Sequence, residues 1–220
     1  MSRPRALIFD YTGVITVPLP MSSDAVTVAG DVTPAHLLRT MMRHELHNPD
    51  PDGLWNRLER GEAPLAELLL RIDEVAPGAS VFFAGGGAVS LMAALTVRAD
   101  VIGRLSRWRD QGVPLALLTN NVKEWRPLWT ANLESAGGLA LFDVIVDSSE
   151  VGMRKPEARI YTHTVDALAS SVGRSLALAD CLFVDDFVQN IEGAAAVGLR
   201  GLLATRDDEH WTTLDRLLAS

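Results

Sequence analysis

Four short hydrophobic runs along the chain end in polar residues. They are ALIFD at 6–10, LALLTNN at 115–121, FDVIVDSSE at 142–150 and CLFVDD at 181–186. Helical patterns long enough for crossovers separate the later runs, and this alternation predicts a parallel sheet with helices on both faces. In an open sheet of this kind, ligands bind at the carboxyl ends of the strands. We therefore expect the polar residues that end the four runs to converge on one crevice.

Helix-end signals accompany these patterns. Asp100 precedes VIGRLSRWRDQG, which ends at Gly112, and Pro156 suits the first turn of the helical pattern PEARIYTHTVDALAS. Farther upstream, Thr33 is a candidate N-cap with Pro34 behind it. These signals predict helices between the strands and in the segment that follows the first strand.

The segment 17–99 separates the first strand from the second and contains helical but few strand-like patterns. Its pattern GLWNRLERGEAPLAELLLRIDEV predicts two helical pieces that are broken near Gly61 and Pro64. We therefore expect a core domain made of residues 1–16 and 100–220, with 17–99 inserted as a mobile helical cap.

Composition narrows the classes of partner. A chain of 220 residues with 48% hydrophobic content can bury a full core. Its 28 acidic and 20 basic residues give a net charge of −8, and it has no basic tract, which excludes nucleic acid as an expected partner.

The sequence also indicates the cellular compartment of the protein. Cys181 is the single cysteine, so no internal disulfide can form and a reducing cytoplasm is favoured. The N-terminus leads directly into a strand instead of a signal-peptide core, and the longest uncharged run, 81–97, is shorter than a bilayer-spanning helix. We expect a cytoplasmic protein that does not bind membranes.

The polar residues near the predicted strand ends supply carboxylate, hydroxyl, amide and ammonium groups. They are Asp10, Thr119, Asn120, Lys155, Asp185 and Asp186. A lone strand-end Asp10 could simply cap a turn, but the joint set suits a phosphate group and a divalent cation. Magnesium prefers oxygen ligands, takes one or two carboxylates, and lets a carboxylate approach an anionic phosphoryl group.

The four motifs resemble those of the haloacid dehalogenase-like superfamily, in the same order and over essentially the whole chain. IFDYTGV is similar to its nucleophile motif, LALLTNN to its threonine or serine motif, VGMRKPEARIY to its lysine motif and CLFVDDFVQNIEGA to its acidic motif. Within the superfamily, the chain most resembles the N-terminal phosphatase domain of soluble epoxide hydrolases. The resemblance implies an α/β fold, with a Rossmann-like parallel-sheet core and an inserted helical cap domain.

The resemblance also implies how the metal and the nucleophile are arranged. Asp10 would be the nucleophile that forms an aspartyl-phosphate. Asp10 and Asp186 would bind Mg²⁺ through their side chains, and Thr12 would bind it through its backbone carbonyl.

The remaining motif residues would act on the phosphoryl group or support the site. Thr119 and Asn120 would bind the phosphoryl group, and Lys155 would orient it and stabilise the nucleophile. Asp185 would support Lys155 and the metal shell, with Asn190 as a further supporting residue.

Thr12 departs from the superfamily pattern. Phosphatases of the superfamily usually carry Asp there, which protonates the leaving oxygen and activates water. General acid–base catalysis of this kind contributes roughly a hundred- to ten-thousand-fold in rate. P-type ATPases nevertheless form an aspartyl-phosphate with threonine at the same position, so Thr12 weakens the case for hydrolysis without removing phosphoryl chemistry.

The sequence thus predicts a magnesium-dependent hydrolase that acts on a small phosphorylated metabolite through Asp10. Two alternatives stay open, a catalytically weakened phosphate-binding or regulatory protein and an enzyme that transfers the phosphoryl group to another acceptor. A zinc site at His44 and His47 would need a third ligand, so we expect none. The motifs fix neither the metabolite nor the oligomeric state.

Overall fold

A computed structural model describes residues 2–18, 50–75, 78–87 and 95–219. Its centre is a five-stranded parallel sheet in the order β3-β2-β1-β4-β5. The strands are β1 (Ala6–Phe9), β2 (Leu115–Thr119), β3 (Val144–Asp147), β4 (Cys181–Asp185) and β5 (Arg200–Leu203). The first four confirm the strands predicted from the hydrophobic runs, and β5 is an addition at the edge beside β4.

Alternate residues of each central strand point to opposite faces of the sheet. Leu7 and Phe9 of β1 join one hydrophobic cluster, and Ala6 and Ile8 join the other. The strands are buried on both faces, as a parallel sheet between helical layers requires.

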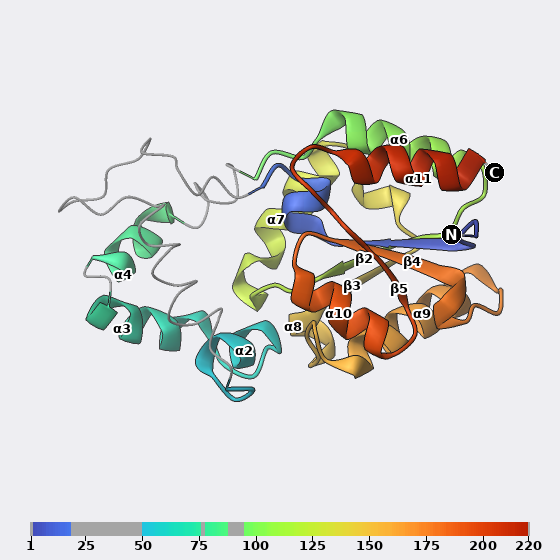
Figure 1. Cartoon of the computed structure of the whole chain (residues 1–220). Coiled ribbons are helices and arrows are strands. Elements are labelled where there is room, and N and C mark those ends of the chain that lie inside the picture. The colour runs from blue at the N-terminus through green and yellow to red at the C-terminus, as the bar shows by residue number, and fades with distance from the viewer. Residues whose placement is uncertain (1, 19–49, 76–77, 88–94, 220) are drawn as a thin grey trace.

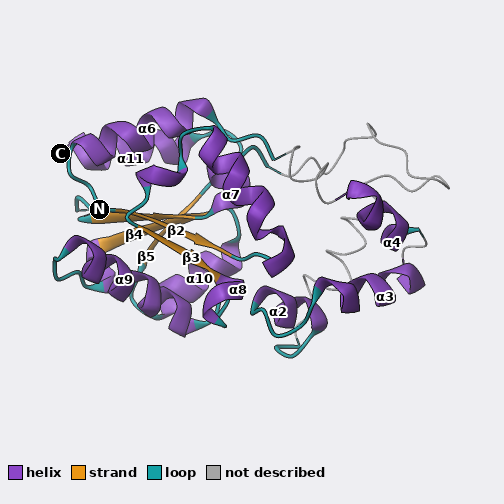
Figure 2. Cartoon of the chain, turned by 180° about the vertical axis from the view of Figure 1, so that it is seen from behind, coloured by secondary structure: helices purple, strands orange, loops and turns teal. Residues whose placement is uncertain are grey.

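Helices cover both faces (Figures 1 and 2). The first face packs against α6 (Ala99–Asp110), α7 (Arg126–Ser135) and α11 (Glu209–Ala219), and the second against α9 (Ala158–Val172) and α10 (Val188–Ala196). Short elements complete the core: η4 (Lys123–Trp125), η5 (Leu139–Leu141), α8 (Ser148–Val151) and η6 (Leu178–Asp180).

An aromatic cluster holds the central strand close to its carboxyl end. The ring of Phe9 stacks on Trp108 of α6 and Trp211 of α11, with centroid distances of 6.2 and 6.0 Å. All three side chains are buried. Burial of such large aromatic groups is a major stabilising contribution, so the backbone just before Asp10 is firmly placed.

Two predicted helix ends differ from the structure. Asp100 lies in the first turn of α6 and Arg98 is the N-cap. Pro156 precedes α9, whose N-cap is Glu157 and whose first residue is Ala158. A proline is well placed just before a helix, because it has no backbone N–H to donate.

Where it is described, the inserted segment consists of helical elements joined by loops and turns, and Val97 near its end forms an isolated bridge with Thr16. Its elements are α2 (Leu54–Glu59), α3 (Leu65–Val75), α4 (Ala79–Phe82) and η3 (Phe83–Gly87). The break between α2 and α3 confirms the interruption predicted near Gly61 and Pro64. Figure 1 shows these helices beyond the edge at which the strands end.

Several predictions fall on residues that the structure does not describe. Thr33, Pro34, His44 and His47 lie between residues 19 and 49, outside the described ranges. Cys181 is buried in β4. Across residues 2–18, 50–75, 78–87 and 95–219, no helix has the length and apolar character needed to cross a membrane.

Candidate active site

Asp10 stands at the carboxyl end of the central strand β1. Its backbone N–H donates to the carbonyl of Val184 at 2.9 Å, which ties it to the neighbouring strand β4. The chain then makes one wide turn, η1 (Tyr11–Ile15), closed by a bond from the N–H of Thr16 to the carbonyl of Tyr11 at 3.0 Å. Within this turn Gly13 has φ +79°, a left-handed conformation that favours glycine. Thr12 is half-buried in the same turn.

Lys155 connects two of the predicted acidic residues. Its Nζ lies 2.7 Å from Oδ1 of Asp10 and 2.7 Å from Oδ2 of Asp185. The side chain of Lys155 is 1% exposed, so this cation is held in the interior by its two carboxylate partners. A buried charge is stable only when it is paired in this way.

Asp185 is oriented by further hydrogen bonds. Nδ2 of Asn190 lies 3.0 Å from each oxygen of the Asp185 carboxylate, and the backbone N–H of Phe187 donates to Oδ1 at 2.8 Å. The two carboxylate oxygens are thus occupied by Lys155, Asn190 and Phe187. Asp185 is therefore bonded to Lys155, and Asn190 is bonded in turn to Asp185.

One buried oxygen of Asp186 is left unsatisfied by the part of the chain that the structure describes. Its Oδ1 atom has no hydrogen-bond partner among the described residues. Oxygen atoms of Asp10, Asp185 and Asp186, one from each, lie within 4.8 Å of one another. A buried carboxylate oxygen without a donor is costly, and a cation would supply the missing partner. The residues present therefore fit a divalent cation.

The electrostatics of the cluster lead to the same conclusion. Burial raises the pKa of Asp10 to about 8, although the charge of Lys155 opposes the rise. Burial also raises the pKa of Asp186 to about 6, with a further rise from the charge of Asp185. Burial by itself lowers the pKa of Lys155, but Asp10 and Asp185 outweigh it and raise that pKa. When ionised, three carboxylates and one ammonium carry a formal charge of −2, which a divalent cation would balance.

The second motif borders this cluster. Thr119 is buried at the end of β2, and its hydroxyl lies 3.4 Å from the carbonyl oxygen of Asn120. The side-chain amide of Asn120 turns toward Lys155, with Nδ2 donating to the Lys155 carbonyl at 3.0 Å and Oδ1 accepting from its N–H at 2.9 Å. Nδ2 also donates to Glu59 at 3.1 Å, so this amide is engaged within the protein.

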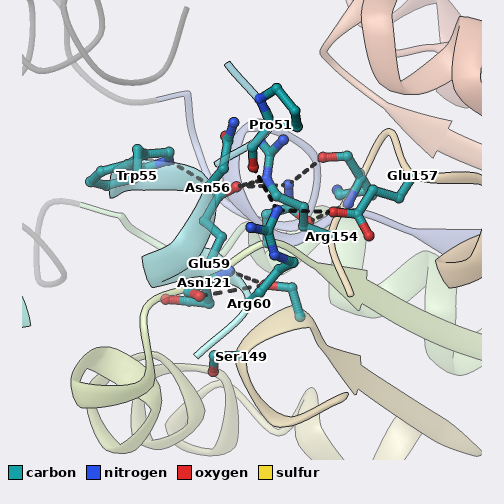
Figure 3. A network of polar contacts seen from close by, with 12 residues as sticks. Pro51, Trp55, Asn56, Glu59, Arg60, Asn121, Ser149, Arg154 and Glu157 are labelled. Carbon is teal, nitrogen blue, oxygen red and sulfur yellow. Dashed lines mark hydrogen bonds and ion pairs between the residues drawn. The ribbon is translucent and has the colours of Figure 1, made fainter. Parts of the chain in front are cut away.

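Glu59 and Arg154 adjoin the site, although Glu59 lies outside the motifs and Arg154, within the lysine motif, had been given no role. Nε of Arg154 donates to Oε2 of Glu59 at 2.6 Å. Figure 3 shows these two side chains in a network that joins α2 to the core. Arg154 directly precedes the motif lysine, which was the one available signal for it. Glu59 has no comparable signal, because its partners lie far away in the sequence.

A protein-family model for "haloacid dehalogenase-like hydrolase" matches residues 4–198. That match covers well over half of the chain, so the protein belongs to this family of hydrolases. The parallel sheet and its strand-end acidic cluster are those that the motifs had indicated.

Curated relatives are similar over part of their own length. The chain is 33% identical over 112 residues to "Phosphatase MT3486" of Mycobacterium tuberculosis, a match that covers 50% of this chain and 47% of that protein. It is 24% identical over 216 residues to "Bifunctional epoxide hydrolase 2" of Rattus norvegicus, covering 90% of this chain and 36% of the relative. The chain therefore spans less than half the length of each of these two relatives. The match to the second relative confirms the predicted resemblance to the soluble epoxide hydrolases.

A solved structure shares the fold. It is a haloacid dehalogenase-like enzyme from Bacteroides thetaiotaomicron, described as a complex with magnesium and inorganic phosphate. The TM-score is 0.54 at 17% identity, with 90% of this chain and 92% of that chain covered. The likeness establishes the shared fold.

Proposed function

We propose that the protein is a magnesium-dependent phosphatase that acts on a small phosphorylated metabolite through an aspartyl-phosphate on Asp10. The observation that carries this proposal is the acidic cluster near the strand ends. Lys155 pairs there with Asp10 and Asp185, and a buried oxygen of Asp186 has no partner within residues 2–18, 50–75, 78–87 and 95–219. The relative named as a phosphatase supports the same reaction class. The net charge of −8 favours a metabolite over nucleic acid as the substrate. We place the reaction in the cytoplasm, where the lone thiol of Cys181 would remain reduced.

The metal would be held by the side chains of Asp10 and Asp186 and by the backbone carbonyl of Thr12. Bound Mg²⁺ would neutralise the excess negative charge of the cluster and allow an anionic phosphoryl group to approach. The related structure described with magnesium and inorganic phosphate supports this choice of metal.

The phosphoryl group would be held from two sides. Lys155 would contribute its ammonium, which already lies 2.7 Å from the nucleophile Asp10. Thr119 would contribute its hydroxyl. Asn120 would contribute its backbone N–H, because its side-chain amide is engaged by Lys155 and Glu59. Fixed donors of this kind stabilise the charge that develops during phosphoryl transfer.

The reaction would then proceed in two displacements at phosphorus. A carboxylate oxygen of Asp10 attacks phosphorus, the bond from phosphorus to the ester oxygen breaks, and the departing alkoxide takes a proton from solvent. Water then attacks the phosphorus of the aspartyl-phosphate and loses a proton to solvent. Breakage of the bond from phosphorus to Asp10 releases inorganic phosphate and restores the carboxylate.

Thr12 sets the efficiency of both displacements. It has no ionisable side chain to protonate the leaving oxygen or to activate water, so substrates with good leaving groups are favoured. The same residue gives weight to a second candidate, a phosphate-binding or regulatory protein that turns over slowly. Transfer of the phosphoryl group to an acceptor other than water is consistent with the same first displacement.

The test is release of inorganic phosphate from an aryl phosphate, followed with and without Mg²⁺. We expect wild-type protein to be active only with the metal, and Asp10→Asn to be inactive under both conditions. Binding of phosphate without turnover would favour the binding-protein candidate. Equal activity in wild type and Asp10→Asn would contradict the proposal.

A further inference from the structure

We propose that Glu59, from the inserted helix α2, is a positioning residue that holds the Lys155 segment of the active site in place. Its predicted effect on the rate of turnover rests on the proposed function. This proposal gives a role at the active site to a residue that lies in the inserted segment, outside the core domain and outside all four motifs.

The buried carboxylate of Glu59 accepts hydrogen bonds from three donors. Its Oε2 accepts from Nε of Arg154 at 2.6 Å and from Nδ2 of Asn120 at 3.1 Å, and its Oε1 accepts from Nε1 of Trp55 at 2.8 Å. Glu59 is 5% exposed, so water cannot readily replace these partners. Charge-assisted bonds in such surroundings are strong and directional.

Two of these partners lead directly to Lys155. The amide of Asn120, which Glu59 holds from one side, brackets the Lys155 residue by bonding both its N–H and its carbonyl. Arg154 is the residue immediately before Lys155. Glu59 therefore fixes the backbone of Lys155 both through Asn120 and through Arg154.

The Lys155 side chain depends on that backbone. Its ammonium must reach Asp10 and Asp185 at the same time, at 2.7 Å from each. A lysine side chain is long and has many rotamers, so its ammonium group has a defined position only if the backbone from which the side chain extends is fixed. A small displacement of a reacting group can cost a large factor in rate.

Helix α2 is itself held against the core, so that Glu59 has a fixed base (Figure 3). Arg60 donates to Glu157 of the core at 3.2 Å, and within the inserted segment it donates to the Pro51 carbonyl at 3.0 Å. At Gly61, a β-carbon would lie 2.3 Å from the carbonyl oxygen of Ser149, so the backbones of Gly61 and Ser149 lie too close together for any side chain at position 61. The end of α2 is thereby fixed to the elements on either side of Lys155.

The variant Glu59→Gln tests this role. A glutamine offers one acceptor oxygen to three donors, so its amide nitrogen must face a donor, and at least one bond is lost. The matched control is Glu62→Gln in the same segment, where the half-exposed carboxylate bonds Arg60. Melting curves establish that each variant is folded. If Glu59→Gln does not fold, Arg154→Gln replaces it with the same expectation, because it removes one partner of Glu59 and leaves α2 unchanged.

The first readout is the reactivity of lysine amines toward an acylating ester, measured by mass spectrometry. The chain contains two lysines, the exposed Lys123 and the buried Lys155, so Lys123 serves as an internal reference. We expect Lys155 to be protected in wild type and in Glu62→Gln. In Glu59→Gln its rate relative to Lys123 should rise about ten-fold, because an unpaired buried donor favours local opening.

The second readout is kinetic. Glu59→Gln should lower kcat on an aryl phosphate by about ten-fold or more, with the affinity for Mg²⁺ unchanged. Equal protection of Lys155 in Glu59→Gln and wild type would overturn the inference, even if the wild type is active. A wild type without turnover would instead reject the proposed function, and the lysine reactivity would still decide the role of Glu59.

Discussion

The carboxylate of Asp186 lies against the backbone of Gly13. A β-carbon placed on Gly13 would stand 2.3 Å from Oδ2 of Asp186 and 2.9 Å from its carboxyl carbon. The turn after β1 thus requires glycine for two reasons, its φ of +79° and the space that the proposed metal ligand occupies. The first and the fourth motif are therefore in direct contact.

Gly13→Ala should weaken Mg²⁺ binding by about 10- to 100-fold, because the added methyl group displaces Asp186. The control is Gly112→Ala, since Gly112 has φ +76° and open space around its β-carbon position. Both variants should lose about 1–2 kcal/mol of stability from the left-handed conformation. Calorimetric titration with Mg²⁺ separates the two effects, and equal metal affinity in both variants would contradict the contact.

Asp10→Asn and Asp186→Ala should each weaken Mg²⁺ binding strongly. The reason is that each removes one of the two carboxylates proposed to ligate the metal, while Lys155 keeps Asp185 as its partner. Loss of a ligand from a magnesium site that uses few carboxylates is poorly compensated by water. Calorimetry on both variants checks this, and unchanged affinity in both would remove the metal assignment.

Thr12→Asp should raise hydrolysis of alkyl phosphates by about ten-fold or more. The added carboxyl group would protonate the leaving oxygen and then activate water. Aryl phosphates, whose oxygen leaves without protonation, should gain much less. Steady-state rates on a matched aryl and alkyl pair provide the measurement, with Asp10→Asn as the blank.

Two results would conflict with this account of Thr12. Rapid hydrolysis of alkyl phosphates by the wild type, with no gain in Thr12→Asp, would show that another group supplies the proton. If both proteins were inert toward every phosphate ester, the binding-protein candidate would be favoured.

His210 should make the fold sensitive to acid. Burial lowers the pKa of His210, and its Nδ1 accepts a hydrogen bond from the N–H of Thr205 at 3.2 Å. The unfolded chain therefore binds the proton more readily, and stability falls as the pH drops below the ordinary value of 6.5.

The variant His210→Asn keeps an acceptor for Thr205 but cannot take up a proton in this range. Between pH 7 and pH 5, wild type should lose about 1 kcal/mol more stability than the variant. Urea unfolding at the two pH values measures the difference. Identical losses would show that His210 is not responsible.

Local patterns were sufficient for the central sheet. The runs that became β1 to β4 are apolar and end in polar residues. Burial on both faces gives β1, β2 and β4 a clear signal, and the edge strand β3 carries a similar apolar run although it is only partly buried. The strand β5 was missed because Arg200–Leu203 is short and only half-buried at the sheet edge. Its sequence RGLL begins with a charged residue and carries no periodicity.

The arrangement of the site was predictable only in part. Asp10 and Asp185 end the neighbouring strands β1 and β4, and the resemblance of the motifs implied that Lys155 acts beside both. The direction of the Asn120 side chain does not, because an amide can serve substrate or protein equally well. Glu59 lies 61 residues from Asn120 and 95 from Arg154, and no local pattern reports contacts over such separations.

The most direct test of the account is to look for phosphate on Asp10. Wild-type protein would be mixed with an aryl phosphate and Mg²⁺, quenched in acid within the first turnover, and digested for mass spectrometry. We predict one phosphate on the peptide that contains Asp10, absent without Mg²⁺ and absent in Asp10→Asn. Two results would contradict an aspartyl-phosphate mechanism. One is release of inorganic phosphate by wild type with no phosphate on that peptide, and the other is turnover in Asp10→Asn equal to that of wild type.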